Sequence, residues 1–123
     1  MKKTVGRFAP SPSGRIHLGN MFCSLLAWLS ARQKDGKIVL RIEDLDTARC
    51  PRRYAEQMED DLRWLGLDWD IGPGMGGPDE PYYQSERTAL YEAYADVIID
   101  EAQSERIGDV LHALCSHFDG EPT

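Results

Sequence analysis

The sequence predicts an α/β fold with parallel strands, and three segments in its first third carry that prediction. Residues 37–42 contain the β-branched run Ile-Val-Leu of a strand, and residues 5–9 form another short strand. Residues 21–32, between them, repeat apolar side chains at helical spacing. Parallel strands need a long crossover, which this helix supplies, so the three segments predict a βαβ unit.

The first helix is expected to be buried. Met21, Leu25 and Leu29 recur at helical spacing, and further apolar side chains fill other faces, namely Phe22, Leu26 and Trp28. A helix that is apolar nearly all round is normally covered on most sides. Asp35-Gly36 follows it and predicts the helix end.

A second helix is expected after the second strand. Pro51 suits the first turn of a helix, and Met58, Leu62 and Leu65 give it an apolar stripe. Gly66 then ends it.

The remainder of the chain predicts a loop, a third helix and a tail. Residues 70–81 contain four glycines and three prolines and are expected to form a loop. Ser85 can cap a helix that runs through Ala95. We place one domain over residues 1–96 and a divergent helical tail over residues 97–123.

Composition indicates one small globular protein in a reducing compartment. Of the 123 residues, 41% are hydrophobic and 28% are charged. No stretch approaches the ~20 apolar residues of a membrane span, and the first residues lack the apolar run of a signal peptide. Three widely spaced cysteines favour free thiols. We therefore expect a cytoplasmic protein with no membrane partner.

Charge is divided unevenly along the chain, whose formal net charge is −7. Residues 1–53 carry 11 Lys and Arg against 4 Asp and Glu, whereas residues 54–123 carry 3 against 17. The basic half suits attraction of an anionic substrate. The alternative is chance clustering on solvated helix faces.

The loop after the first strand has the features of a phosphate site. Residues 10–14 hold two prolines, two serines and a glycine, and His17 and Gly19 fall where the helix should begin. A helix N-terminus presents unpaired N–H donors, a glycine lets a nucleotide approach the backbone, and an imidazole can donate to a phosphate oxygen. Ligands bind outside the carboxyl ends of parallel strands, so this loop should meet the carboxylates that follow Ile42. The alternative is a plain loop with an exposed histidine.

Three sequence blocks occur in order. They are Arg7-Phe8-Ala9-Pro10-Ser11-Pro12-Ser13-Gly14 with His17-Leu18-Gly19-Asn20, then Arg41-Ile42-Glu43-Asp44-Leu45-Asp46 with Arg49, and finally Leu65-Gly66-Leu67-Asp68-Trp69-Asp70 with Tyr82-Tyr83-Gln84-Ser85-Glu86-Arg87. Together they resemble class I aminoacyl-tRNA synthetases of the glutamyl type, over residues 4 to about 96. The resemblance implies a Rossmann-like nucleotide-binding domain, of which this chain is the N-terminal part.

The resemblance also implies a role for each of several residues. Glutamate would be bound by four of them, with Arg7 on a carboxylate and Glu43 accepting the α-ammonium: Arg7, Ala9, Ser11 and Glu43. ATP would be bound by Pro10, His17, Gly19 and Asn20, of which the last three are catalytic. Asn20 stands where the family often has a second histidine. Its amide donates a hydrogen bond without becoming cationic, so charge stabilisation there should be weaker.

The implied reaction joins glutamate to ATP, with Mg²⁺ accompanying the nucleotide, and then transfers glutamate to tRNA. Pro-Ser-Pro-Ser-Gly and Arg-Ile-Glu-Asp-Leu-Asp resemble glutamyl-Q tRNA(Asp) synthetases, which place glutamate on queuosine in the anticodon of tRNA(Asp). An ordinary glutamyl-tRNA synthetase fragment is the alternative. The sequence lacks the family's lysine loop and the second half of its nucleotide fold, so an inactive nucleotide- or glutamate-binding module is a third interpretation.

Two further expectations concern surfaces and metals. A partial domain should expose a sheet edge or apolar helix surface, which favours marginal stability or self-association. His112, Cys115 and His117 lie close together without a fourth ligand, so we expect no zinc. Cys23 and Cys50 are interpreted as structural.

Overall fold

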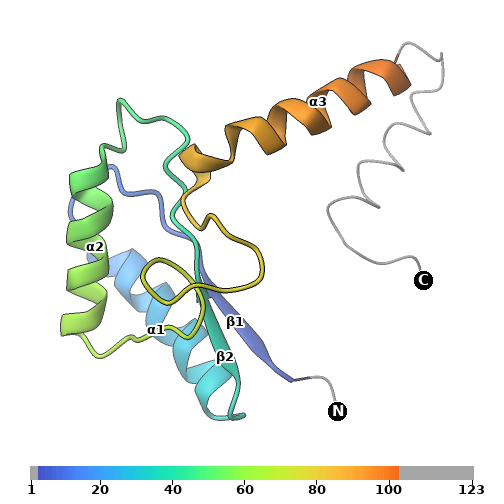
Figure 1. Ribbon diagram of the computed structural model, residues 1–123. Coiled ribbons are helices and arrows are strands. Elements are labelled where there is room, and N and C mark those ends of the chain that lie inside the picture. Colours follow the sequence, from blue (N-terminus) through green and yellow to red (C-terminus); the bar gives the residue numbers. More distant parts are fainter. Residues whose placement is uncertain (1–2, 103–123) are drawn as a thin grey trace. The chain divides into compact units, whose positions relative to one another are not determined.

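The computed structural model describes residues 3–102 (Figure 1). Its elements, in order, are β1 (Val5–Phe8), α1 (Leu18–Arg32), β2 (Lys37–Leu40), α2 (Arg52–Trp64), the 3-10 helix η1 (Gln84–Arg87) and α3 (Thr88–Ala102). The chain divides into two compact units, Met1–Arg87 and Thr88–Thr123. The first unit contains every predicted site residue.

The predicted parallel βαβ unit is confirmed. β1 pairs with β2 in parallel register, with Val5 opposite Lys37 and Phe8 opposite Leu40. Figure 1 shows the two strands side by side, with α1 as the crossover between them. The two strands therefore end at the same edge, and the segments that follow them leave the sheet together.

Two later segments extend the sheet on the edge of β2 opposite β1. Isolated parallel bridges join Val39 to Ile71 and Ile42 to Tyr83. The Leu40 N–H donates to the Ile71 carbonyl at 2.8 Å. The Ile42 N–H donates to the Tyr82 carbonyl and the Ile42 carbonyl accepts the Gln84 N–H, so the two segments pair backbone groups that a two-stranded sheet would leave unpaired.

The core lies against one face of β2. Ile38, Leu40 and Ile42 alternate along the chain, so they share a face, and each is fully buried. They pack with residues of every neighbouring segment: Phe8, Ala31, Ala55, Met58, Leu62, Leu67, Trp69 and Tyr83. The predicted stripe on α2 is confirmed at Met58 and Leu62.

Gly6 brings α1 close to the sheet. A Cβ on Gly6 would lie 2.9 Å from Ile38 Cδ1 and 3.2 Å from the Ala27 carbonyl oxygen. The helix backbone can approach β1 this closely because residue 6 has no side chain.

The predicted near-complete burial of the first helix is wrong. α1 begins at Leu18, three residues earlier than expected, and Ala31 is its buried residue. Met21 and Trp28 are half-buried, and the other large apolar side chains of the helix are exposed, namely Leu18, Phe22, Leu25, Leu26 and Leu29. Among the described elements α1 packs mainly against β1 and β2, so side chains on its other faces stay in solvent. The expected exposure of an apolar helix surface is therefore confirmed.

The other boundaries agree with the sequence, with one exception. α2 follows Pro51 and ends before Gly66, whose φ of +78° suits a glycine. Ser85 does not begin the third helix: it lies within η1, and α3 starts at Thr88. The Ser85 hydroxyl instead donates to Asp44 at 2.7 Å.

A polar cluster fixes the segment after α2 to the βαβ unit. Asp70 accepts the Ile38 N–H and an Arg32 N–H, each at 2.7 Å, and Asp68 accepts the Trp28 indole N–H at 2.8 Å. Burial raises the pKa of the Asp70 carboxyl, but the bonds from Ile38 and Arg32 outweigh it and hold that pKa below its usual value. The Trp28 bond likewise lowers the pKa of Asp68, against a smaller opposing effect of burial.

Several expectations concern cysteines, the tail and membranes. Cys50 is buried, as a structural thiol would be, whereas Cys23 is exposed. The domain limits at 96 and 97 remain a prediction, and the tail helix with His112, Cys115 and His117 lies outside the described residues. Within residues 3–102, every helix is too short or too polar to cross a membrane.

Candidate active site

Arg7 and Glu43 meet where the two strands end. Arg7 Nη2 lies 3.8 Å from Glu43 Oε1, with 61% of the Arg7 side chain and 33% of the Glu43 side chain exposed. A long ion pair between such exposed groups contributes at most about 1 kcal/mol, so a ligand can open it at little cost. The pair therefore offers one cationic and one anionic group to a zwitterion.

Ser11 lies on the same side as Glu43. Both line a cavity of about 330 Å³, together with Ser13, Leu45, Asp46, Arg49, Cys50 and Gln84. Burial, followed by the nearby Asp46 carboxylate, raises the pKa of the Cys50 thiol, which therefore stays neutral in this wall. Ala9 and Pro10 are half-buried between β1 and the loop. The Pro10 carbonyl accepts the Glu43 N–H at 2.9 Å, which ties the loop to the segment after β2.

His17, Gly19 and Asn20 form a second group at the start of α1. His17 is the N-cap, with extended backbone, and its carbonyl accepts the Met21 N–H at 3.0 Å. The imidazole is exposed and makes no side-chain cap bond. The first N–H groups of the helix are thus available to an anion beside an exposed imidazole. The predicted position of His17 and Gly19 at the helix start is confirmed.

Sequence reasoning assigned no role to several residues of the first cavity. Asp46, Arg49 and Gln84 line it, and in the sequence each of them belongs to a motif block without an individual role. Membership in these blocks was the only indication in the sequence that the three residues could belong to the site. The parallel bridge between Ile42 and Tyr83, which brings Gln84 beside Glu43, could not be predicted from the sequence.

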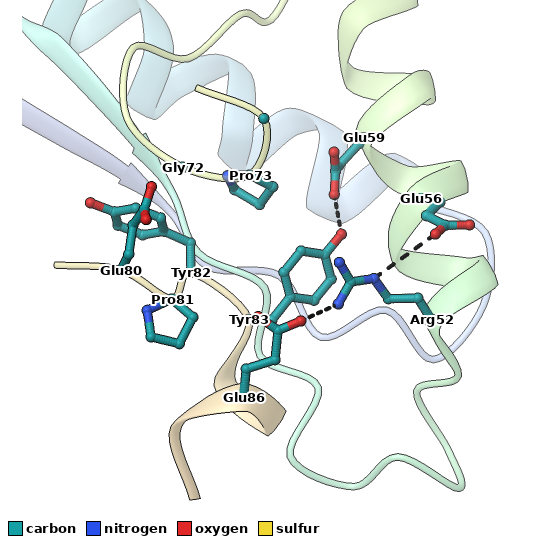
Figure 2. A pocket seen from close by; sticks show the side chains of 11 residues that line it. Arg52, Glu56, Glu59, Gly72, Pro73, Glu80, Pro81, Tyr82, Tyr83 and Glu86 are labelled. Atoms are coloured by element: carbon teal, nitrogen blue, oxygen red, sulfur yellow. Dashed lines mark hydrogen bonds and ion pairs between the residues drawn. The ribbon is translucent and has the colours of Figure 1, made fainter. Parts of the chain in front are cut away.

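A second cavity, of about 400 Å³, lies between α2 and the segment that leads into η1 (Figure 2). The Arg52 guanidinium lies 3.4 Å from the centre of the Tyr83 ring and binds Glu86 at 2.6 Å. The Tyr83 hydroxyl donates to Glu59. Burial, followed by that bond, raises the pKa of Tyr83 well above its ordinary value. Arg52, Tyr83, Glu59 and Glu86 are thus hydrogen-bonded or ion-paired with one another. These contacts connect α2 to η1, so we interpret this cavity as structural.

Comparison with known protein families shows which one this chain matches. A family model described as "tRNA synthetases class I (E and Q), catalytic domain" matches residues 3–106. The chain belongs to this family. The predicted resemblance to glutamyl-type class I synthetases and the predicted Rossmann-like fold with parallel strands are therefore confirmed.

Individual relatives are similar over most of this chain. It is 63% identical over 86 residues to a glutamyl-Q tRNA(Asp) synthetase of Symbiobacterium thermophilum, covering 70% of this chain and 27% of that protein. It is 57% identical over 93 residues to one of Nitratidesulfovibrio vulgaris, covering 76% and 29%. A glutamate–tRNA ligase of Anaeromyxobacter sp. strain K is 50% identical over 104 residues, covering 85% and 22%.

A solved structure agrees. A glutamate tRNA ligase from Elizabethkingia meningosepticum, crystallised with its amino acid, superposes with a TM-score of 0.74 at 41% identity, covering 80% of this chain and 20% of that one. The synthetase chain thus spans less than a third of the length of the relatives described.

Proposed function

We propose that this chain supplies the glutamate- and ATP-binding part of a glutamyl-Q tRNA(Asp) synthetase. The observation that carries the proposal is the meeting of Arg7 and Glu43 at the ends of two neighbouring parallel strands. The loop that follows Arg7 leads directly to the N-terminus of α1. An amino-acid pocket and a phosphate-binding helix end are therefore joined by one short segment.

Glutamate fits the first group by charge. A guanidinium holds a carboxylate, and a carboxylate accepts an ammonium, so Arg7 and Glu43 are complementary to an acidic zwitterion. The Ser11 hydroxyl supplies a further donor, and the small side chain of Ala9 lets a ligand approach the loop. Binding would replace the 3.8 Å pair by two ligand contacts.

ATP fits the second group. The N–H groups at the start of α1, the His17 imidazole and the Asn20 amide are all donors for phosphate oxygens. Gly19 adds no side chain there, and Pro10 stiffens the approach. Mg²⁺ would enter with the nucleotide as its counter-charge.

The reaction depends mainly on positioning. A carboxylate oxygen of glutamate attacks the α-phosphorus of ATP and forms the new O–P bond of glutamyl-adenylate. The bond from the α-phosphorus to the oxygen that bridges it to the β-phosphate breaks, and pyrophosphate leaves. Such chemistry needs alignment and charge stabilisation more than a protein nucleophile, and donors aimed at developing charge act chiefly in the transition state. His17 and Asn20 would serve that role, and tRNA would be engaged by the complete enzyme.

The glutamyl-Q assignment is supported by identities of 63% and 57% to glutamyl-Q tRNA(Asp) synthetases, against 50% to a glutamate–tRNA ligase. The gene product that contains this chain should transfer labelled glutamate to queuosine-containing tRNA(Asp) and leave tRNA(Glu) uncharged. Charging of tRNA(Glu) instead would favour an ordinary glutamyl-tRNA synthetase.

The pocket assignment is tested by two substitutions measured against two ligands. Arg7→Ala should weaken glutamate binding by about 10- to 100-fold, because a charge-assisted hydrogen bond worth ~1.5–3 kcal/mol is lost. It should leave ATP affinity nearly unchanged, whereas His17→Ala should lower ATP affinity and spare glutamate. Calorimetry with each ligand on both variants of the full chain measures these effects.

Arg53→Ala serves as the control, because Arg53 is exposed, lies over the Tyr54 ring at 5.0 Å and is not among the residues that line the first cavity. It should bind both ligands like the parent chain. Equal loss of both ligands in Arg7→Ala and His17→Ala would mean collapse of the loop and would refute separate roles.

Catalysis by the chain alone is a separate question. Glutamate-dependent ATP–pyrophosphate exchange above a no-enzyme control would demonstrate activation by these residues. Binding of both ligands without exchange would identify the chain as an inactive nucleotide- and glutamate-binding module.

A further inference from the structure

Asp44 is a buried carboxylate next to a site residue. It is 3% exposed, and it follows Glu43 directly in the chain. Its Oδ1 accepts the Ser85 backbone N–H at 2.9 Å and its Oδ2 accepts the Ser85 hydroxyl at 2.7 Å. A buried charge persists only when it is hydrogen-bonded, and here both carboxylate oxygens are bound by a single residue.

The Asp44–Ser85 contact continues a backbone ladder. The Ile42 N–H donates to the Tyr82 carbonyl at 2.9 Å, and the Gln84 N–H donates to the Ile42 carbonyl at 2.8 Å. The next position on each segment is joined by the Asp44 side chain in place of a backbone bond. Two segments about 40 residues apart in sequence are thereby fastened at the point where the ladder ends.

Both of the joined segments also contribute to the first cavity. Glu43 precedes Asp44 and Gln84 precedes Ser85, and both of these preceding residues line the cavity that contains Ser11. The side-chain partner of Glu43 is Arg7, at 3.8 Å, which is too long and too exposed to fix a carboxylate. Because this side-chain contact is weak, the placement of Glu43 depends on the backbone segment that carries it.

We propose that Ser85 is a positioning residue that acts through Asp44. By fastening residue 44 to residue 85, it holds Glu43 and Gln84 as two walls of one cavity at the spacing that a glutamate ammonium requires. The inference rests on the proposed function, since it concerns the same pocket. It assigns a role to the Gln84-Ser85-Glu86-Arg87 block that the sequence alone left without one.

The test is glutamate binding by Ser85→Ala in the full chain. Loss of the hydroxyl leaves Asp44 Oδ2 unpaired and loosens the wall, so the dissociation constant for glutamate should rise about five- to tenfold. ATP affinity should stay within about twofold, because α1 is not part of this contact. Ser85→Thr keeps the hydroxyl and should restore glutamate affinity.

Trp28→Phe is the matched control. It also removes one side-chain hydrogen bond of similar length to an aspartate, the 2.8 Å bond to Asp68. Neither Trp28 nor Asp68 is among the residues that line the first cavity. It should lower stability without weakening glutamate binding. The proposal is overturned if Ser85→Ala binds glutamate normally, if Ser85→Thr loses as much as Ser85→Ala, or if Trp28→Phe weakens glutamate equally.

Amide hydrogen exchange tests the same idea without a ligand. The Glu43 N–H donates to Pro10, and the Leu40 N–H donates to Ile71. In Ser85→Ala, exchange at Glu43 should accelerate while exchange at Leu40 stays unchanged. Unchanged exchange at Glu43, or equal acceleration at both amides, would overturn the positioning role. Failure of the parent chain to bind glutamate would instead overturn the proposed function, and the exchange result would still decide the role of Ser85.

Discussion

Gly19 leaves room for the imidazole of the residue that caps its helix. A Cβ on residue 19 would lie 3.2 Å from Cε1 and 3.3 Å from Nδ1 of His17. Those distances are tighter than ordinary contacts, so the ring would have to shift by a few tenths of an ångström. The ring is exposed and can move. A side chain at residue 19 should therefore change the position of the imidazole without destabilising the fold.

Gly19→Ala should therefore separate nucleotide binding from stability. Alanine in place of a helical glycine stabilises by about 0.5–1 kcal/mol, so the melting temperature should hold or rise. ATP affinity should fall because the imidazole is displaced, as calorimetry would measure. Ser30→Ala is the control, since Ser30 is an exposed residue near the opposite end of the same helix and its replacement also raises helix propensity. Unchanged ATP affinity in Gly19→Ala would remove the His17 ring from the nucleotide contact.

At the scale of elements, the segment after α2 joins the βαβ unit through carboxylates. Asp70 bonds the β2 backbone and Arg32 of α1, so three parts of the chain meet at one side chain. The pKa of Asp70 is depressed in the folded protein, so its contribution to stability is present above its unfolded pKa, near 4, and is lost as pH falls through the folded value.

Asp70→Asn should consequently destabilise the protein at neutral pH and matter less in acid. At pH 7 the loss of charge-assisted bonding should cost about 1 kcal/mol, since these groups are partly exposed. Below about pH 4 the parent chain loses the same contribution, so the two melting temperatures should converge. Thermal melts of both proteins from pH 7 to about pH 2.5 test this, and a constant difference across that range would contradict it.

At the scale of the whole molecule, the exposed face of α1 favours self-association. Phe22 is 58% exposed, and four leucines accompany it on the same helix. An apolar surface of this kind gains free energy when it is covered. A second copy of the chain is the partner always present in solution.

Phe22→Glu should shift the protein toward monomer in sedimentation experiments over a concentration series. Met75→Glu adds the same charge at a loop residue that is 60% exposed, and it should leave the association unchanged. A parent chain that sediments as a monomer at all concentrations and melts cooperatively at high temperature would contradict the prediction.

Local patterns were enough to predict the elements and the family. The apolar run of 37–42, Pro51 and Gly66 act over a few residues, and the strand, the helix start and the helix end appear where they were expected. The convergence of Arg7 with Glu43 was also predictable, because the carboxyl ends of parallel strands lie at one edge of a sheet.

Local patterns could not predict which side chains of α1 are buried or which residues hold the site residues in place. The periodicity of α1 predicted what could be buried, but whether Phe22 is covered depends on which segments pack there. The Ser85 hydroxyl could cap a helix, but in the structure it donates to Asp44, which is 41 residues away in the sequence.

The βαβ unit, the position of His17 at a helix start and the membership of the synthetase family were therefore predictable from the order of the amino acids. Each of these depends on interactions between near neighbours or on motif residues in fixed order. Two contacts were visible only in the folded chain: Gln84 and Glu43 line the same cavity, and Ser85 donates hydrogen bonds to Asp44. Those contacts join segments about 40 residues apart, and they form because the parallel bridge between Ile42 and Tyr83 sets their register.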